Sequence, residues 1–394
     1  MGMNILHTVE FYAPSIGGMQ EVVRQISERL VKLGHSVTVA TTRLPERVAA
    51  DIKGVKIVAF DISGNEVRGY RGDTESYSRF LLNGKFDIVS NFAAQQWATD
   101  LMFPVMEQIS AKKVFVPTGF SGLHWPQYRG YFQKMPEIMR RYDRNVFLSE
   151  NYRDIDFARR HGIDNGVVIP NGAGADEFLP RPKLNVRAKY GIADDDFLVL
   201  LVGSHTGLKG QAEAIRLCTG SRIRNATLLI VANAPGGGCT RRCRIKASVF
   251  DWWRKVSQSS KRILIEEMTR EETVAAYHEA DLFLFPSNIE CSPIVLYECM
   301  ASKTPFLVTD VGNAAEIIRW SGGGRLLPTC ATKTGFSKAR IGGSVALLEE
   351  LWRDSTSRGS MAEAGFMAWK ERFTWEKITA GYENLYLSLL QEDC

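Results

Sequence analysis

The sequence predicts an α/β fold made of two doubly wound parallel sheets, each in a domain of its own. Residues 4–40 give a strand, a loop with two glycines, a helix and a second strand, which is the β-α-β unit of parallel sheets. Residues 282–285 form an apolar run too short for a globular helix and typical of a strand buried on both faces. A length of 394 residues is enough for two cores.

In the first domain the first strand covers residues 4–9, and apolar residues at helical spacing between Val22 and Leu33 predict the helix that follows it. Gly17 and Gly18 lie between this strand and this helix. Because glycine has no Cβ, their N–H groups can approach a diphosphate closely, although a tight turn explains the pair as well. The remaining strands of this domain are predicted at residues 36–40, 56–60, 86–90, 113–117, 145–149 and 167–169.

Residues that follow these strands are candidates for a binding surface. Ligands of doubly wound sheets bind beyond the carboxyl ends of the strands. Asn91, Thr118 and Gly119 come at such ends, as do Phe120 and Glu150, and we expect them to line a ligand-binding surface. Ordinary loop structure is the alternative for each of them.

A glycine- and proline-rich stretch at residues 171–182 is suited to a linker and a hinge, and we place the domain boundary there. The second domain has predicted strands at residues 197–202, 228–231, 263–265, 282–285 and 306–308, and a turn into a short strand at residues 322–327. This alternation of strands and helices predicts a second parallel sheet.

Lys209 lies in a glycine-rich loop, residues 203–210, directly after a strand of the second domain. The loop does not match the phosphate-binding pattern G-x-x-x-x-G-K-[ST]. A lysine at the carboxyl end of a strand can nevertheless neutralise two phosphates as a point charge. The alternative is a solvated surface lysine.

A strand, a loop and the start of a helix are predicted over residues 282–301. Pro293 is suited to the first helical turn because it lacks an N–H group, and Ser292 before it is a candidate N-cap. The N–H groups of Ile294, Val295 and Leu296 would then be available to an anion such as a phosphate.

Glu290 and Glu298 lie at the two ends of this segment. A fixed carboxylate accepts hydrogen bonds from the hydroxyls of a sugar or a ribose, so two of them near an anion site suggest a nucleotide sugar. The alternative is an ordinary strand, loop and helix with two surface glutamates.

The composition limits the partners and the location of the protein. Hydrophobic residues make up 45% and charged residues 24% of the chain, as in ordinary soluble globular proteins. A net charge of +5 is compatible with anionic ligands but does not indicate nucleic acid, so no nucleic-acid partner is predicted. The amino-terminal residues lack the features of a signal peptide, and no apolar run is long enough to span a bilayer. We expect a cytoplasmic protein whose membrane contact, if any, is peripheral and at the inner face.

Residues 235–255 combine three glycines, clustered arginines and two tryptophans. Such a stretch is compatible with peripheral contact to a membrane surface or with a second anion site. An exposed loop followed by an amphipathic helix that packs on the sheet is the interpretation we favour.

The seven cysteines are scattered along the chain. They contain no C-x-x-C pair and no spacing typical of zinc sites, so we expect free thiols and predict neither a metal site nor a cofactor.

Two glutamates separated by seven residues and followed by residues 299–312 resemble the signature of retaining glycosyltransferase family 4. The likeness extends to residues 169–172 with Phe178, to residues 202–210 and to residues 373–375, in the family's order. It therefore covers nearly the whole chain.

The resemblance implies the GT-B fold, in which two Rossmann-like domains face a cleft and the final helix crosses back to the first domain. It implies an acceptor-side domain at residues 1–172, completed by about residues 376–394, a linker at 173–182 and a donor domain at 183–375. It also implies a reaction that needs no metal ion, with the nucleotide sugar as co-substrate.

The resemblance also assigns roles to particular residues. Glu290 would be catalytic and lie near the anomeric carbon, and Glu298 would bind the ribose. The donor's diphosphate would be bound by the backbone and side chains of Gly17, Gly18, Lys209, Ser292, Pro293, Ile294 and Val295.

The chain departs from the family at two places. The family usually has an arginine just after the first strand of the donor domain, where this chain has Ser204 and His205. A protonated His205 could take over that charge at low pH. Many members also have a histidine near the position of Thr118, whereas here His124 lies a few residues downstream.

The expected function is transfer of a hexosyl or N-acetylhexosaminyl group from a UDP- or GDP-sugar to a hydroxyl acceptor, with retention of configuration. The acceptor would be a glycan, a glycolipid or a glycoprotein, as in the biosynthesis of cell-surface polysaccharides. Two alternatives remain, a nucleotide-sugar-binding protein without catalysis and a sugar-nucleotide epimerase of the same fold.

Overall fold

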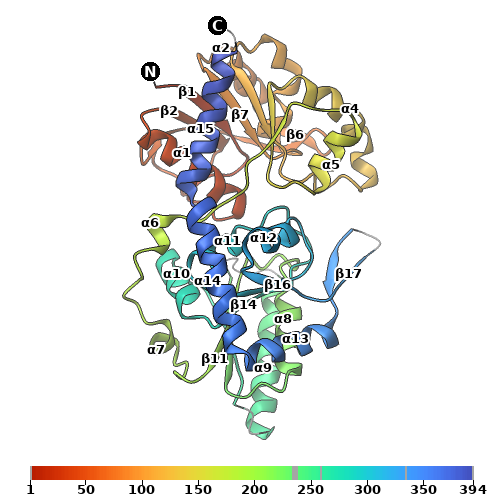
Figure 1. Cartoon of the computed structure of the whole chain (residues 1–394). Coiled ribbons are helices and arrows are strands. Elements are labelled where there is room, and N and C mark those ends of the chain that lie inside the picture. The colour runs from red at the N-terminus through yellow and green to blue at the C-terminus, as the bar shows by residue number, and fades with distance from the viewer. Residues whose placement is uncertain (1, 233–237, 258–259, 333–334, 393–394) are drawn as a thin grey trace. The chain divides into compact units, whose positions relative to one another are not determined.

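The computed structural model describes residues 2–232, 238–257, 260–332 and 335–392, and the chain divides into two compact units. Unit 1 consists of Met1–Asn171 together with Trp375–Cys394, and unit 2 consists of Gly172–Thr374. Each unit contains one large parallel sheet with helices packed against it (Figure 1).

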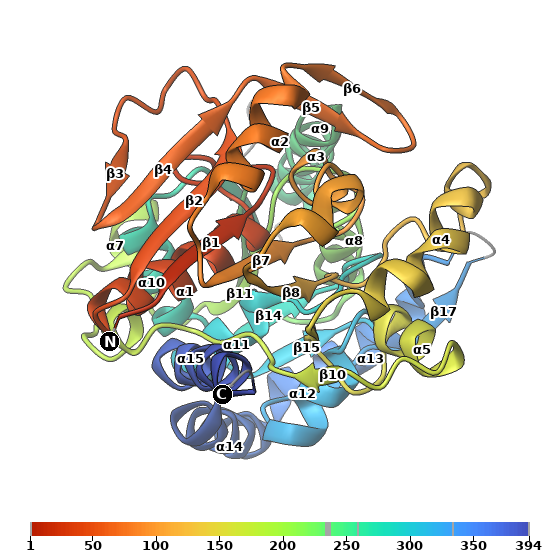
Figure 2. The same ribbon diagram turned by 90° about the horizontal axis from the view of Figure 1, so that it is seen from above.

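The sheet of unit 1 has eight strands in the order β10-β9-β8-β7-β1-β2-β4-β3, and the central part of this row is visible in Figure 2. All neighbouring strands are parallel except β3 and β4. The strands are β1 (Asn4–Thr8), β2 (Ser36–Thr42), β3 (Asp51–Ile52), β4 (Val55–Phe60), β7 (Ile88–Phe92), β8 (Lys112–Val116), β9 (Arg144–Phe147) and β10 (Gly166–Val168).

The helices of unit 1 include one from each end of the chain, α1 and α15, which pack against each other beside the sheet (Figure 1). Arg29 of α1 pairs with Glu376 of α15 at 2.9 Å, and the hydroxyl of Tyr386 of α15 lies 2.7 Å from that of Ser90 in β7. The helical elements are α1 (Gly18–Lys32), α2 (Thr74–Asn83), α3 (Trp97–Asp100), η1 (Phe103–Gln108), η2 (Pro126–Tyr128), α4 (Arg129–Arg140), α5 (Arg153–Arg160) and α15 (Trp375–Gln391).

The sheet of unit 2 has six strands in the order β13-β12-β11-β14-β15-β16, and all of its neighbouring pairs are parallel. Its central strands are apolar and buried, because helices cover both faces of a parallel sheet. The strands are β11 (Phe197–Val202), β12 (Ala226–Val231), β13 (Arg262–Glu266), β14 (Leu282–Phe285), β15 (Phe306–Val308) and β16 (Gly324–Leu326).

The helices of unit 2 connect these strands and cover the sheet. The helix after β14, α11, packs against the long helix α14 near the end of the unit. The helices are α6 (Ala175–Phe178), α7 (Val186–Tyr190), α8 (Gln211–Gly220), α9 (Gly238–Ser257), α10 (Arg270–Glu279), α11 (Ile294–Ala301), α12 (Ala314–Ser321), α13 (Ile341–Arg353) and α14 (Ser355–Arg372).

The predicted fold class is confirmed, and each strand predicted from the sequence is present with its ends shifted by a residue or two. Strand β3 and two antiparallel hairpins were not predicted, the hairpins being β5 (Ile62–Asn65) with β6 (Gly69–Gly72) and β17 (Thr329–Ala331) with β18 (Ser337–Ala339). Their strands are short and mostly polar, so they lack the apolar pattern that identifies a buried strand.

Each sheet has one point at which the strand order reverses. In unit 2 the chain builds β12 and β13 on one side of β11, and then places β14, β15 and β16 on the other side. In unit 1 the same reversal lies between β1 and β7. Ligands of such sheets bind at this switch point, beyond the carboxyl ends of the strands. The loops after β11 and β14, and those after β1 and β7, are therefore the places to look for a site.

Candidate functional site

In unit 2 the loops after β11 and β14 touch each other. The N–H of Asn288 donates to the carbonyl of Leu208 at 2.7 Å. Gly210, which ends the first loop, has a φ of +76°, and a Cβ there would lie 2.1 Å from the carbonyl oxygen of Pro286. Only glycine fits this contact, so the glycine-rich sequence is what allows the two loops to approach closely.

Lys209 and Glu290 are brought together by this contact. The Lys209 ammonium lies 2.7 Å from Oε1 of Glu290, and the hydroxyl of Ser287 donates to the same oxygen at 2.8 Å. The side chain of Glu290 is 10% exposed and that of Lys209 is 29% exposed. An ammonium has three N–H donors, so Lys209 can hold this carboxylate and still bind an anion.

Helix α11 begins one residue later than predicted, which corrects the expected roles of Ser292 and Pro293. Pro293 is the N-cap, with a ψ of 111°, and the helix starts at Ile294. Ser292 lies outside the helix and does not cap it, because the extended backbone of Pro293 separates it from the first turn. The N–H of Leu296 donates to the carbonyl of Pro293 at 3.2 Å. The N–H groups of Ile294 and Val295 lie at the start of the helix, where no earlier helical residue offers a carbonyl to them.

The second predicted carboxylate, Glu298, lies in α11 and is buried. Arg270, the first residue of α10, pairs with Glu298 at 2.6 Å through one nitrogen and with Glu177 at 2.6 Å through another. Sequence reasoning missed Arg270. A signal was present, because Thr269 and Glu272 form a capping box that places Arg270 at the start of a helix just after β13.

His205 follows β11 and lies in a buried position. Its ring is 5% exposed, and burial together with Arg244 holds its pKa below the ordinary value. The suggestion that a protonated His205 replaces the family's arginine at low pH stays a prediction, and the lowered pKa means that this would need a lower pH than for an ordinary histidine. Gln211 donates to the carbonyls of Gly203 and Ser204, both at 3.0 Å, so a neutral amide supports this part of the loop.

Sequence reasoning also missed a cluster in unit 2. His205 and two cysteines of α9, Cys239 and Cys243, have ligand atoms that all lie within 4.8 Å of one another. The expectation of scattered thiols without a metal-type arrangement overlooked this cluster because His205 lies more than thirty residues before the two cysteines in the sequence.

In unit 1, Gly17 and Gly18 lie where the loop after β1 enters α1. Gly17 is the N-cap of that helix, Gly18 is its first residue, and a Cβ added to Gly18 would meet nothing within 4 Å. The loop before them is held by Arg47, which donates to the carbonyls of Tyr12 and Ala13 at 2.8 and 2.6 Å. Their role in binding a diphosphate stays a prediction.

The predicted acceptor-side residues fall into different environments. Asn91 is fully buried in β7, where its amide donates to Thr8 at 2.7 Å and accepts from Tyr142 at 2.9 Å. This burial argues against direct contact between Asn91 and an acceptor. His124 is exposed, and partial burial together with Arg153 and Arg160 lowers its pKa.

Three successive residues after β8 have a left-handed backbone. Thr118, Gly119 and Phe120 have φ values of 57°, 93° and 48°. Asp154 holds this loop by accepting from the N–H of Gly119 at 2.8 Å. A β-branched or aromatic residue in this conformation is strained, and such strain often marks a functional site.

The loop after β7 is cross-linked to its neighbours by residues that sequence reasoning missed. The carbonyl of Gln95 accepts from Asn65 at 2.9 Å, and its side chain accepts from the N–H of Gly122 at 3.1 Å. Gln96 accepts from the N–H of Glu10 in the loop after β1 at 2.6 Å. The three loops at this edge of the unit 1 sheet are therefore joined by neutral hydrogen bonds.

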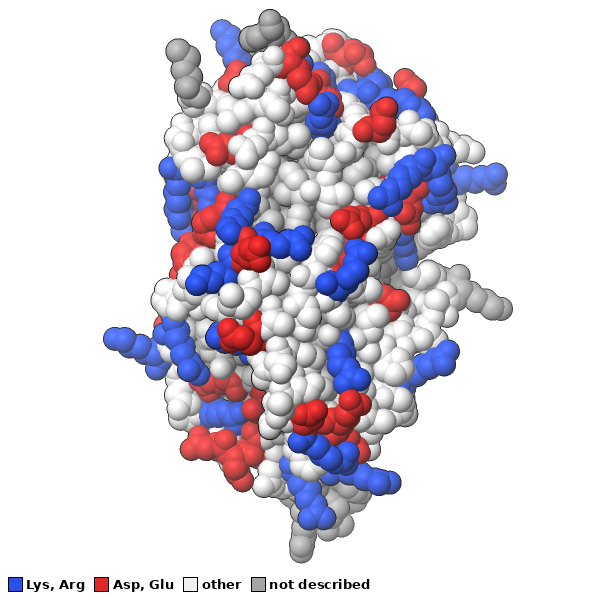
Figure 3. Space-filling view, viewed as in Figure 1, with Lys and Arg blue, Asp and Glu red and all other residues white. Residues whose placement is uncertain are grey.

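Residues 235–237, part of the stretch considered for membrane contact, lie outside the described residues. The described part of the stretch belongs to α9, and none of the described helices combines the length and hydropathy needed to cross a membrane. Figure 3 shows Lys and Arg side chains interspersed with Asp and Glu over the described part of the face drawn. On that face neither the positive nor the negative side chains form an extended patch.

Comparison with known families gives two matches that together cover most of the chain. A model described as Glycosyltransferase Family 4 matches residues 16–177, and one described as Glycosyl transferases group 1 matches residues 182–339. A D-inositol 3-phosphate glycosyltransferase of Acidothermus cellulolyticus is 27% identical over 232 residues, which is 57% of this chain. The match spans about half of that relative, 48% of its length.

Solved structures share the fold over the whole chain. A sucrose-phosphate synthase from Thermosynechococcus elongatus superposes with a TM-score of 0.79 at 18% identity, covering 98% of this chain and 99% of the other. An Anabaena protein solved with UDP-glucose gives a TM-score of 0.73 at 14% identity, covering 98% of this chain and 100% of the other. At these identities the likeness establishes the arrangement of strands and helices.

Proposed function

The chain belongs to glycosyltransferase family 4 and has the GT-B fold, and on that premise we propose that it moves a sugar from a nucleotide diphosphate sugar to a hydroxyl acceptor with retention of configuration. The observation that carries the proposal is the pair of Lys209 and Glu290 at the switch point of unit 2. A cation for phosphate and a carboxylate for a sugar lie side by side where such sheets bind ligands.

The diphosphate is bound by the positive groups that surround the pair. Lys209 supplies a point charge, and the first-turn N–H groups of Ile294 and Val295 add the positive end of α11. These donors are fixed before the reaction, so they stabilise the charge that develops on the departing phosphate. In this proposal they do the work that a metal ion does at other diphosphate sites.

Glu290 acts on the sugar. Its carboxylate is held by Ser287 and Lys209, and in this proposal it faces the anomeric carbon and stabilises positive charge there. The bond from that carbon to the phosphate oxygen breaks as the bond to the acceptor oxygen forms. The acceptor's proton goes to the departing diphosphate, which keeps the reaction balanced without an added base.

Glu298 and Arg270 position the nucleoside. The carboxylate of Glu298 has two oxygens and about four acceptor positions, so the ion pair with Arg270 leaves capacity for the ribose hydroxyls. Arg270 fixes the carboxylate and offsets the cost of its burial. A donor whose nucleoside has both ribose hydroxyls suits this arrangement, and the fold neighbour solved with UDP-glucose supports a nucleotide sugar as donor.

A thermal-shift panel with UDP, GDP, ADP, dTDP and CMP and their sugars identifies the donor. A ligand at about 100 times its Kd should stabilise the protein by roughly 2.7 kcal/mol. The nucleotide sugar that shifts the melting temperature is then incubated with hydroxyl acceptors, and the anomeric configuration of the product is read by NMR. Nucleotide binding with no transfer to any acceptor would favour a binding protein, and rearranged donor without acceptor would favour an epimerase.

The proposal that no metal takes part in transfer has its own test. Activity should not require Mn²⁺ or Mg²⁺ and should not rise when either ion is added. If a chelator abolished transfer and Mn²⁺ restored it, the diphosphate site would need a metal ion and the role given to Lys209 would be wrong.

A further inference from the structure

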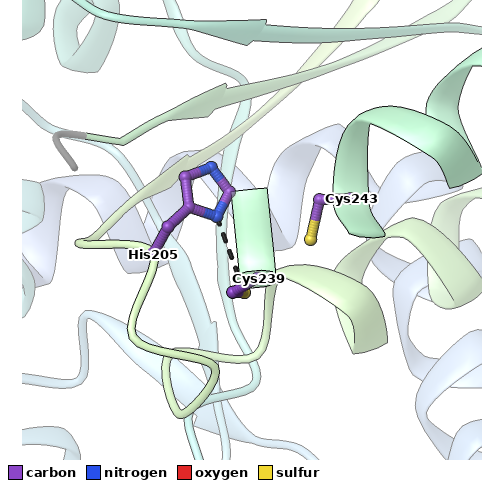
Figure 4. Close-up of side chains that lie close together, drawn as sticks. All are labelled: His205, Cys239 and Cys243. Carbon is purple, nitrogen blue, oxygen red and sulfur yellow. Dashed lines mark hydrogen bonds between the residues drawn. The ribbon is translucent and has the colours of Figure 1, made fainter. Parts of the chain in front are cut away.

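The cluster of His205, Cys239 and Cys243 has the composition of a zinc site. His205 comes from the loop after β11, and the two cysteines are four residues apart on α9, so they share one side of the helix (Figure 4). β11 and β12 are adjacent parallel strands, and the segments that follow them meet at one edge of the sheet. The topology thus brings distant residues together.

The distances agree with ligation. A tetrahedral zinc ion with bonds of about 2.05 Å to nitrogen and about 2.3 Å to sulfur puts its nitrogen and sulfur ligands about 3.6 Å apart and two sulfurs about 3.8 Å apart. Nδ1 of His205 lies 3.7 Å from Sγ of Cys239, and the three ligand atoms all lie within 4.8 Å. A movement of about 1 Å or less would complete the geometry.

The histidine has few other partners among the described residues. Nε2 is buried without a hydrogen-bond partner there, and the ring is 5% exposed. A hydrogen bond joins Nδ1 to Sγ of Cys239, and a thiol is a weak hydrogen-bond partner. A metal ion at Nδ1 would replace this weak contact and would leave Nε2 as it is. A bound metal ion would give the cluster a favourable interaction.

We propose that His205, Cys239 and Cys243 bind one Zn²⁺ ion that ties the loop carrying Lys209 to the start of α9. Imidazole and thiolate ligands favour zinc, and three protein ligands leave the fourth position for water. This site lies outside the transfer reaction proposed above. It departs from the sequence-based expectation of no metal site, and its role is to hold residues 203–210 in place.

Metal titration of the apoprotein under a non-chelating reductant tests the site. Wild-type protein should bind one equivalent of Co²⁺ with a thiolate charge-transfer band, and one equivalent of Zn²⁺ should bleach that band and raise the melting temperature. Cys239→Ser and Cys243→Ser should lower the affinity by at least the roughly 10- to 100-fold that loss of a supporting partner costs. Cys330→Ser, which alters an exposed cysteine of the same unit, should bind as the wild type does.

His205→Gln keeps both thiols and should bind more weakly with an altered Co²⁺ spectrum. If the wild-type protein gave no thiolate band, the proposal would be wrong, and the cluster would be held by S–H hydrogen bonds alone. This outcome does not depend on whether the serine variants fold. Equal binding by Cys239→Ser and the wild type would also overturn it. Neither outcome bears on transfer, because the readout is metal binding and not activity.

Discussion

The two switch points are built from different chemistry. In unit 2 the loops after β11 and β14 meet through Lys209 and Glu290, and helices α10 and α11 meet through Arg270 and Glu298. In unit 1 the loops meet through amides such as Gln96 and through a strained backbone at residues 118–120. A charged edge suits an anionic ligand such as a nucleotide diphosphate, whereas an edge of neutral groups suits a ligand that brings hydroxyls.

The comparison also shows how each edge is kept in shape. The unit 2 loops are close because Gly210 permits it, and the ion pairs hold them. The unit 1 loops depend on buried carboxyls, since Asp154 accepts from Gly119 and Asp100 accepts from Tyr131 at 2.7 Å. Removing a charged side chain should therefore weaken ligand binding or transfer in unit 2. Changing the pH or relieving backbone strain should instead change the stability of unit 1.

The largest effect is expected from Glu290→Gln. The change keeps the size of the side chain and removes the charge that we propose to lie next to the anomeric carbon, so kcat should fall by about 10²- to 10³-fold, as for loss of one preorganised stabilising group. Steady-state transfer rates and calorimetric binding of the donor nucleotide measure the two effects separately. Glu363→Gln, in the exposed pair of Lys303 with Glu363 at 2.7 Å, is the matched control.

Lys209→Ala should weaken the binding of the donor nucleotide. Loss of a hydrogen bond to a charged group costs about 1.5–3 kcal/mol, which corresponds to roughly a 10- to 150-fold rise in Kd. Calorimetry with the nucleotide identified by thermal shift gives this value. Lys303→Ala should bind as the wild type does, and an equal loss in both variants would assign the effect to net charge instead of to the site.

Unit 1 should lose stability as the pH rises. Burial raises the pKa of Asp154 to about 6 and that of Asp100 to about 7, from an ordinary value of 3.8. Between about pH 4 and pH 7 these two carboxyls therefore bind more protons in the folded unit than in the unfolded chain, and the stability that they contribute is lost through that window. His7, whose pKa burial lowers to about 3, opposes part of this loss below about pH 6.5.

The free energy of unfolding of unit 1 can be measured at each pH from hydrogen exchange of the slowest amides in β1 and β7, corrected for the intrinsic exchange rate. Asp100→Asn keeps an acceptor for Tyr131 and should flatten the profile. An unchanged profile in Asp100→Asn would show that its ionisation does not set the stability of the unit.

Arg270→Gln should destabilise unit 2 by about 1 kcal/mol. The loss is modest because Arg270 is partly exposed, and solvent screens its attraction to Glu298. It should also weaken nucleotide binding, since the buried Glu298 loses the group that orients it. Chemical denaturation and calorimetry measure the two effects. Arg325→Gln, from a pair in which both side chains are exposed, should change neither by more than about 0.5 kcal/mol.

Thr118→Gly should give the smallest effect. Glycine adopts the left-handed conformation without the cost of about 1 kcal/mol that a residue with a Cβ incurs, so unit 1 should become slightly more stable. If the strain positions an acceptor, transfer should fall while stability rises. Chemical denaturation measures the stability, and the KM for the acceptor measures the effect on transfer. If the strain has no function, transfer should stay unchanged.

Much of the fold could be predicted from the sequence, because buried strands such as residues 197–202 and 282–285 carry an apolar signal of their own. The proximity of Lys209 and Glu290 could also be anticipated, since both follow strands that end at the same edge. The pairing of Arg270 with Glu298 could not be predicted, because it depends on how the first turn of α10 packs against α11. The cluster at His205 depends on the register of α9, which spacing in the sequence does not reveal.

Hydrogen exchange across the chain, with and without the nucleotide that shifts the melting temperature, tests the central claim most directly. The claim is that the loops of Lys209 and Glu290 bind the diphosphate of a sugar nucleotide. We expect added protection in unit 2 at peptides covering residues 203–210 and 286–296. Binding that left these peptides unchanged, or the absence of binding by any nucleotide, would contradict the account.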